Sequence, residues 1–461
     1  MTAEEMETVI NQAETELNEC FQILMDIKRG KLQDADSFLQ FQPKLADCLY
    51  DLMKQYKKVI AEEKETIAKK KHMDIDVFTN QMREYAVWKE AIKKTMETGK
   101  AIGDGFAWFF YRNSPEELEK HYEHEDNGLF VAGIGGRGEI EFIREKQNIE
   151  GCFVLYHSIT NMLRVGDFSL CTVDGYVIGL GELKSEYADS QLNVTAYVTS
   201  KIEIHNRNSE EEGSVTKLNI NPSPERLKRQ LKSQEQLLTK EKGENQKADQ
   251  WISYQYHLIT QAMNSPAFSS ISDDNSMVVV AVKEEGSLWQ VLTSESKPES
   301  DNIEEFLQMV KKTIIEESSF NKIHYQPVDL GMLPFRKPII WWELEDNVIR
   351  GILFYKITVF TIYNVAHFYE KLISRGFTVQ KENGYKITRK SGKGLVRLES
   401  PEMLLDLITH DFISNDEIVH FIEMGLKGAV GAKKESVKMK LSLHQNPFGK
   451  PQKEAAGQED S

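Results

Sequence analysis

The sequence contains few cysteines and no long uninterrupted run of apolar residues. Its four cysteines are widely spread, and no two of them form a Cys-x-x-Cys pair, which argues against a zinc site and is typical of a reducing compartment. The richest apolar stretch, 349–365, is broken by Arg350 and Lys356, so no membrane-spanning helix is expected. Residues 1–6 also lack the basic start of a secretory signal. We therefore expect a cytoplasmic protein that does not associate with membranes.

Basic residues are outnumbered by acidic ones. The chain has 57 Lys and Arg against 72 Asp and Glu, a net charge of −15. This balance argues against a protein that coats nucleic acid through its total charge. A local basic groove remains compatible with it, because counterion release depends on the contacting face alone.

The length of the chain and the changes in its local composition predict several domains. At 461 residues with 40% hydrophobic content, the chain exceeds what one core usually organises. We expect a helical region over 1–100, a mixed helix and strand core over 101–295, and a further α/β domain over 296–431. The last of these would serve regulation or target recognition. The remaining 432–461, rich in Lys, Gln, Gly and Pro, are expected to be disordered.

The amino-terminal region has the apolar spacing of packed helices. One seam alternates steps of four and three residues, as in a coiled coil: Met6, Ile10, Ala13, Leu17, Cys20, Leu24 and Ile27. A similar seam follows from Leu45 to Val59, and a third helix is expected over 75–96. The seams fit either a helical bundle within the chain or an arm that joins copies into a homo-oligomer, and periodicity alone does not separate the two.

From Gly99 onward the sequence indicates glycine-rich loops, strands and short helices. The expected order is a helix, four strands, a long helix and a buried strand: 138–148, 152–157, 165–172, 176–185, 192–205, 225–263 and 277–283. Further along, the proline- and aromatic-rich stretch 333–343 is expected at an edge or entry segment. Its aromatics fit either a core or a base-stacking platform.

The most informative feature is a predicted hairpin that carries acidic residues. Asp174 and Gly175 stand between two apolar runs, the pattern of a two-residue type I′ turn. The register set by that turn places Asp167 opposite Glu182, with their Cβ atoms roughly 4.5–5.5 Å apart. Lys184 follows two residues later and projects from the same face.

Two facing carboxylates repel each other, so the pair needs a compensating partner. Mg²⁺ or Mn²⁺ would supply it, since these ions prefer hard oxygen ligands and activate water beside a phosphoryl group. Lys184 would then stabilise the transition state. The alternative is a surface hairpin on which Lys184 only masks the carboxylates.

This arrangement, Asp167 followed by a hairpin and then Glu182-Leu183-Lys184, resembles the PD-(D/E)XK nuclease superfamily. The resemblance implies a metal-dependent phosphodiesterase, acting on DNA more readily than on RNA, in a setting such as restriction or antiviral defence. It implies a restriction-endonuclease-like mixed sheet flanked by helices, so the expected fold is a multidomain α/β (α+β) protein. Where the family name has proline, this chain has Gly166.

The resemblance also implies further site residues. The first core helix of the family usually contributes a carboxylate, and Glu139 fits that role, with Glu141 as second choice. Some members carry a Gln-x-x-x-Tyr motif on the second core helix, and Gln250 and Tyr254 have that spacing. These two would contact the substrate.

Other functions remain as rivals. The run from Gly133 to Gly138 reads as GxGxxG, but the expected second strand ends near His157 without the acidic residue of a dinucleotide-binding fold. A catalytically inactive nuclease-like module that binds nucleic acid or protein is the main alternative. A structural assembly factor built on the amino-terminal helices is the other.

Overall fold

The chain forms a mixed α+β protein. The computed structural model describes residues 2–31, 35–111, 115–121, 133–149, 152–172, 176–188, 191–200, 254–293, 303–331, 336–382, 384–391, 394–398 and 401–430. Helices and antiparallel sheets alternate through these ranges, which confirms the expected fold class at that level. Within them, no helix has the length and apolar character needed to cross a membrane. The tail expected to be disordered, 432–461, lies outside them.

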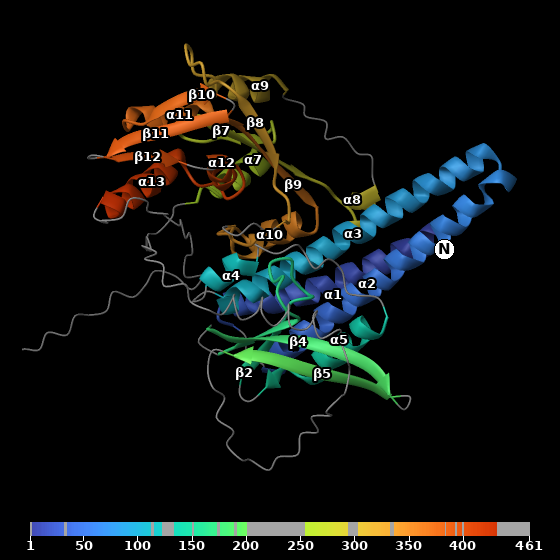
Figure 1. The fold of residues 1–461 in the computed structure, drawn as a ribbon. Helices are drawn as coiled ribbons and strands as arrows, with labels where there is room; N and C mark the ends of the chain where they lie inside the picture. The colour runs from blue at the N-terminus through green and yellow to red at the C-terminus, as the bar shows by residue number, and fades with distance from the viewer. Residues whose placement is uncertain are drawn as a thin grey trace, which may run out of the picture.

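Three long helices form the amino-terminal part and project from the rest of the molecule (Figure 1). They are α1 (Ala3–Lys28), α2 (Ala35–Lys69) and α3 (Ile75–Tyr111), with the short 3₁₀ helix η1 (Lys70–His72) between the last two. The predicted seam of α1 is buried against its neighbours, with side chains only 0–7% exposed. The seam therefore holds a bundle within one chain, and it is not available to a second copy.

Helix α3 continues through a segment that the sequence predicts to be loop. Gly99, Gly103 and Gly105 all lie inside it, and α3 ends only at Tyr111. A Cβ atom on Gly103 would stand 1.8 Å from the carbonyl oxygen of Ile159, and one on Gly105 would stand 2.2 Å from Cγ2 of Ile340. These glycines weaken an isolated helix, but here they let two other segments approach the helix backbone.

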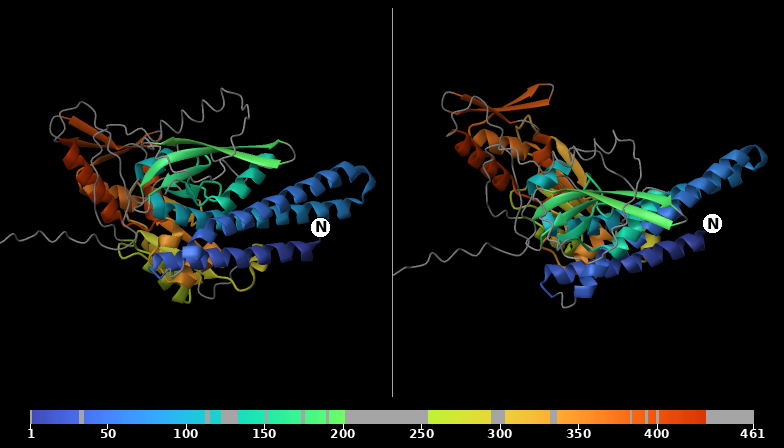
Figure 2. Two further views of the ribbon diagram at one scale, coloured as in Figure 1. Left: turned by 90° about the horizontal axis from the view of Figure 1, so that it is seen from below. Right: turned by 60° about the horizontal axis from the view of Figure 1, so that its bottom comes forward.

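The first sheet is an antiparallel meander. After α4 (Pro115–His121) and α5 (Ile134–Glu145), its strands follow in the order β1-β2-β3-β4-β5: β1 (Asn148–Ile149), β2 (Cys152–Tyr156), β3 (Phe168–Cys171), β4 (Val177–Ala188) and β5 (Gln191–Ser200). Helix α5 packs on β4, β5 and α2, so that the sheet forms a layer beside the long helices (Figure 2). The four strands expected between 152 and 205 are confirmed.

The strand expected to complete this sheet belongs to another one. β7 (Met277–Lys283) pairs along its full length with β9 (Ile357–Asn364), in a sheet of order β6-β7-β9-β8. Strand β6 is Ser269–Ile271, β8 is Ile323–Pro327, and a third sheet contains β10 (Thr378–Glu382), β11 (Gly384–Ser391) and β12 (Gly394–Leu398). The apolar character of β7 reflects burial in this second sheet, so the expected domain limit near 295 does not coincide with a structural break.

The remaining helices of this part are α7 (His257–Asn264), α8 (Leu288–Thr293), α9 (Ile303–Lys312), η2 (Ile339–Trp341), α10 (Asp346–Leu353), α11 (Ala366–Ser374), α12 (Pro401–Thr409) and α13 (Asn415–Val430). Of these, α8 and η2 pack on α3.

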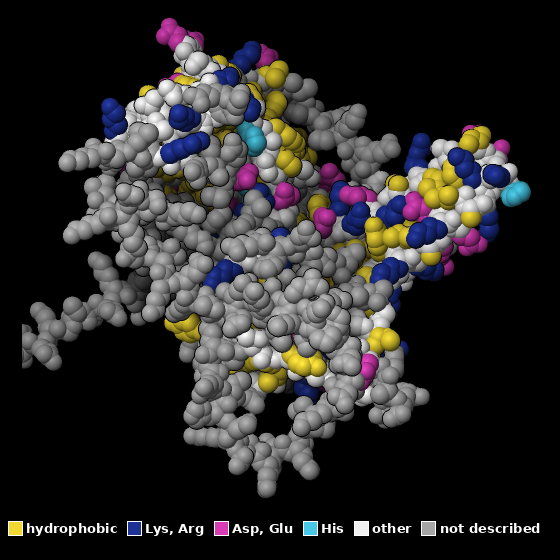
Figure 3. All heavy atoms as spheres, in the orientation of Figure 1, with side chains coloured by type: hydrophobic (Ala, Val, Ile, Leu, Met, Phe, Trp, Pro, Cys, Tyr) yellow, Lys and Arg dark blue, Asp and Glu magenta, His cyan; other side chains and the backbone are white. Residues whose placement is uncertain are grey.

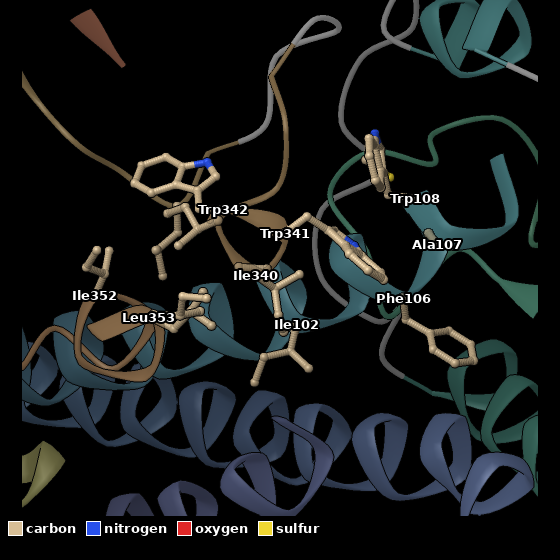
Figure 4. Packing of buried hydrophobic residues seen from close by; sticks show 14 of the residues in the cluster. Ile102, Phe106, Ala107, Trp108, Ile340, Trp341, Trp342, Ile352 and Leu353 are labelled. Atoms are coloured by element: carbon tan, nitrogen blue, oxygen red, sulfur yellow. The ribbon is translucent and has the colours of Figure 1, made fainter. Parts of the chain in front are cut away.

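A shared core joins the carboxy-terminal part to α3 (Figure 4). Ile102 and Phe106 of α3 lie in the same apolar cluster as Ile340, Trp341 and Leu353. Nε1 of Trp341 donates to the carbonyl oxygen of Gly105 at 2.8 Å. The aromatics of the stretch 333–343 that the structure describes are therefore core residues.

Candidate active site

The register between β3 and β4 is the one expected at the end that carries the acidic residues. Phe168 pairs with Gly181, Ser169 with Leu180 and Leu170 with Gly179. Continued by one residue, this register places Asp167 opposite Glu182. The pairing shifts by one residue only beyond Leu170, toward the turn. The turn residues Asp174 and Gly175 lie outside the described part of the chain.

Two neighbouring residues set the direction of the acidic side chains. A Cβ atom on Gly181 would lie 2.0 Å from Cζ of Phe168, so the ring of Phe168 covers β4 where glycine leaves room. That ring also contacts Phe142 of α5, with centroids 5.9 Å apart. Successive residues of a strand point to opposite faces, so Glu182 and Lys184 project away from this face.

Glu182 and Lys184 form a buried ion pair. Nζ of Lys184 lies 2.5 Å from Oε1 of Glu182, and the two side chains are only 16% and 5% exposed. A carboxylate with so little solvent contact needs compensation for its lost hydration, and Lys184 supplies part of it.

Asp167 lies at the edge of β4, beside Glu182. Its Oδ2 accepts a hydrogen bond from the backbone N–H of Leu183 at 2.5 Å. Burial raises the pKa of the Asp167 carboxyl well above its usual value, and the charges of Glu182 and Glu139 raise it further. The Leu183 N–H and the Lys184 ammonium oppose this rise. Asp167 therefore belongs to a cluster that disfavours full ionisation.

Glu139, on α5, interacts with the cluster through its charge. The preceding residue, Gly138, allows the helix to approach β4, since a Cβ atom there would lie 2.0 Å from Oγ of Ser185. Burial raises the pKa of Glu139 to about 7, and the charge of Glu182 adds to the rise, against the opposing effects of Ser158 and Lys100. The third glycine of the GxGxxG pattern therefore serves helix packing.

Lys100 is a member of the site that sequence reasoning missed. It lies on α3, is 6% exposed, and its charge favours the ionised forms of Glu139 and Asp104. The only signal in the sequence was a lysine among small residues in a segment predicted to be loop. Once that segment is a helix packed on the sheet, its lysine is buried near the carboxylates.

The expected substrate-binding pair is not placed in this cluster. Gln250 lies outside the described residues. Tyr254, predicted on a helix running to 263, instead forms an isolated β-bridge with Ile413 and stacks on Tyr256 at 5.0 Å. The helix here begins only at His257. Tyr254 is thus a packing residue of the carboxy-terminal part, which corrects its expected position.

The donor set suits a hard divalent cation. It consists of carboxylates: burial is the main cause of the raised pKa values of Asp167 and Glu139, and the charge of Glu182 adds to both. A bound cation relieves such repulsion. Within the described ranges, no group of three or more His, Cys, Asp or Glu side chains is already arranged to hold a metal ion. Metal binding would therefore require the carboxylates to reorient, with Glu182 turning from Lys184 and Asp167 from Leu183.

Comparison with known proteins adds no relative: no family model matches the chain, and no curated protein or solved structure is significantly similar to it.

Proposed function

We propose that this protein is a metal-dependent nuclease whose site is formed by Asp167, Glu182, Glu139 and Lys184. The observation that carries the proposal is the position of Asp167 beside Glu182 across the strand pair, together with the charge of Glu182, which adds to the rise that burial causes in the pKa values of Asp167 and Glu139. Strong shifts of several pKa values by burial and specific neighbouring charges are more frequent at functional sites than elsewhere. Structural stability alone gives no reason to bring these carboxylates together.

Asp167 and Glu182 would hold Mg²⁺ or Mn²⁺, with Glu139 as an auxiliary ligand or base. When bound, the ion would lower the pKa of a coordinated water and neutralise charge that develops on a phosphoryl group. Lys184, already directed at Glu182, would be released by the ion to stabilise that developing charge.

The surrounding elements support a restriction-endonuclease-like core. A helix, α5, is followed by the antiparallel strands β2, β3 and β4, with Asp167 directly before β3 and Glu182 in the middle of β4. The family's usual fourth strand is not supplied by β7, so only the helix and the meander support this part of the proposal. A role in restriction or antiviral defence would follow from the same likeness.

A polyanionic substrate is supported by the second half of α2 together with η1. Residues 54–72 contain seven lysines and three glutamates, although the whole chain is acidic. Lysine side chains lie exposed along the projecting helices (Figure 3). Such a basic surface suits a phosphate backbone, and we propose DNA as the favoured substrate.

The test is a cleavage assay with purified full-length protein. Plasmid DNA and a structured RNA are incubated with Mg²⁺, with Mn²⁺ or with EDTA, and Glu182→Gln is run beside the unaltered protein. Cleavage that needs the metal and is lost in Glu182→Gln supports the proposal. Failure to cleave either nucleic acid with either metal would contradict it.

The second candidate is a nuclease-like module that binds without catalysis. It is favoured by the Glu182–Lys184 ion pair, which neutralises one charge of the site without a metal. Nucleic acid retained equally in Mg²⁺ and in EDTA, with no cleavage, would identify this alternative.

A further inference from the structure

The backbone that leads into Asp167 is held at every residue by two buried histidines. Nδ1 of His121, at the end of α4, accepts hydrogen bonds from the backbone N–H groups of Arg164 and Val165 at 3.0 and 3.1 Å. Nδ1 of His157 donates to the carbonyl oxygen of Gly166 at 3.0 Å. The backbone N–H of His157 donates to the carbonyl oxygen of Asp167 itself, also at 3.0 Å.

The two histidines are joined through Tyr111 and Ser169. Nε2 of His121 lies 3.0 Å from the Tyr111 hydroxyl, which lies 2.7 Å from Oγ of Ser169. Oγ of Ser169 in turn lies 2.6 Å from Nε2 of His157. All four side chains are at most 3% exposed. They connect α3 and α4 to strand β3 beneath the site.

The donor and the acceptor of each hydrogen bond in this series can be assigned. Because Nδ1 of His121 accepts from two N–H groups, the neutral ring carries its proton on Nε2 and donates to Tyr111. Tyr111 then donates to Ser169, and Ser169 donates to Nε2 of His157. That last nitrogen must accept, since Nδ1 of His157 carries the proton of a neutral ring. Burial lowers the pKa of His157 to about 4, so its ring is neutral at pH 7.

A further contact fixes the other end of the same loop. Oδ1 of Asp104, on α3, accepts from the backbone N–H groups of Asn161 and Met162 at 2.7 and 2.9 Å. The segment between β2 and Asp167 is therefore attached to the helical part at two points. Its position depends on how α3 and α4 dock on the sheet.

We propose that Tyr111 and His121 are positioning residues that fix the backbone of Asp167 beside β4, from where its carboxylate can turn toward a metal ion. The inference rests on the proposed function, in which Asp167 is a metal ligand. Of the hydrogen bonds described above, none joins either side chain to a carboxylate of the cluster. They act through the backbone of residues 164–167, and they make the geometry of the site depend on the docking of the helices.

The test compares two buried tyrosines in the full-length protein. Tyr111→Phe removes the one hydroxyl that links Nε2 of His121 to Oγ of Ser169. Tyr363→Phe is the matched control: its hydroxyl is equally buried and donates to Oδ1 of Asn415 at 2.6 Å, far along the chain in the second sheet. Both variants are expected to lose thermal stability. A difference between them in metal binding is therefore not explained by a general loss of stability.

Two readouts distinguish positioning from stability. Mg²⁺ affinity should fall in Tyr111→Phe and stay unchanged in Tyr363→Phe. Because Tyr111 acts through the loop, the fall should be smaller than the about 10- to 100-fold that follows loss of a direct hydrogen-bond partner of a metal ligand. Amide exchange at Leu183, whose N–H donates to Asp167, should accelerate only in Tyr111→Phe. His121→Asn, which keeps an acceptor for the two N–H groups, should retain more Mg²⁺ affinity than His121→Ala.

The outcomes separate this inference from the proposed function. Equal behaviour of the two tyrosine variants in Mg²⁺ affinity and in Leu183 exchange would overturn the positioning role and leave the metal site intact. Absence of Mg²⁺ binding in the unaltered protein would overturn the proposed function. Exchange at Leu183 would then still decide whether Tyr111 positions Asp167.

Discussion

Nζ of Lys184 lies 2.5 Å from Oε1 of Glu182, two residues earlier on the same strand. Both side chains leave the sheet on one face, so the pair follows from strand alternation. The pair neutralises one charge of a cluster that contains three carboxylates. Replacing Lys184 tests whether this lysine takes part in catalysis or only balances the charge of the carboxylates.

Lys184→Ala should lose most of the cleavage activity while metal and nucleic-acid binding persist. Losing one preorganised electrostatic contact at a transition state typically costs about 100- to 1,000-fold in rate. The measurement is the single-turnover rate beside Mg²⁺ and nucleic-acid binding curves. If Lys184 only screens the carboxylates, the variant should bind Mg²⁺ more tightly and cleave as well as the unaltered protein.

Mg²⁺ affinity should increase with pH through about neutrality. The pKa of Glu139 is about 7, and a carboxyl group must lose its proton to bind a metal. Titrations between pH 6 and 8 should show this increase, and Glu139→Gln should weaken it. Glu141→Gln is the matched control, because Glu141 is exposed and pairs with Arg144. Equal effects of the two variants on the pH dependence of Mg²⁺ affinity would show that Glu139 is not a residue of the site.

The same raised pKa predicts the pH dependence of folding without metal. A carboxyl group with a pKa of 4.5 in the unfolded chain and about 7 when folded binds more protons in the folded state. Its contribution to the free energy of unfolding therefore falls as pH rises from about 4.5 to about 7. In thermal melts in EDTA, the stability of Glu139→Gln should fall less with rising pH than that of the unaltered protein. Identical pH profiles would contradict the assignment.

Gly103→Ala should destabilise the protein and disturb the loop before Asp167. The new Cβ would stand 1.8 Å from the carbonyl oxygen of Ile159, and backbone cannot yield as a side chain does. A cost of about 1–3 kcal/mol is typical of such overpacking. Gly135→Ala, with nothing within 4 Å of the new atom, is the control for chemical denaturation. An equal loss of stability in the two variants would show that packing at Gly103 does not cause the destabilisation.

Replacing Lys57, Lys58 and Lys64 by alanine should weaken nucleic-acid binding. Each lost phosphate contact reduces the slope of log affinity against log salt concentration by about 0.9 for duplex DNA. Salt titrations of DNA binding measure this. Replacing the exposed Lys311 and Lys312 of α9 should leave the slope unchanged. An unchanged slope in the α2 variant would exclude these lysines from the interface.

The part of the site that could be predicted from the sequence is the part fixed by local geometry. Strand alternation and the register of one hairpin give the relation of Asp167 to Glu182, even though the pairing shifts near the turn. Glu139 was predicted through a family resemblance, and its approach depends on Gly138, whose role is visible only once Ser185 faces it.

What sequence reasoning missed depends on contacts between distant segments. Gly99 to Gly105 carry a local signal for loop, but packing against Ile159 and Ile340 makes the segment helical and buries Lys100. The strand β7 has an apolar pattern that fits either sheet, and no local property indicates that its partner is β9. The pairing of His121 with the loop before Asp167 is equally nonlocal.

The proposed activity depends most directly on a metal site at Asp167. Calorimetric titration of the full-length protein with Mg²⁺ and with Mn²⁺ at pH 8, beside Asp167→Asn, tests for this site. We expect saturable binding to the unaltered protein and its loss in Asp167→Asn, because the near-isosteric amide removes the charge that holds the ion. Binding of neither ion, or equal binding by both proteins, would contradict the proposed metal site.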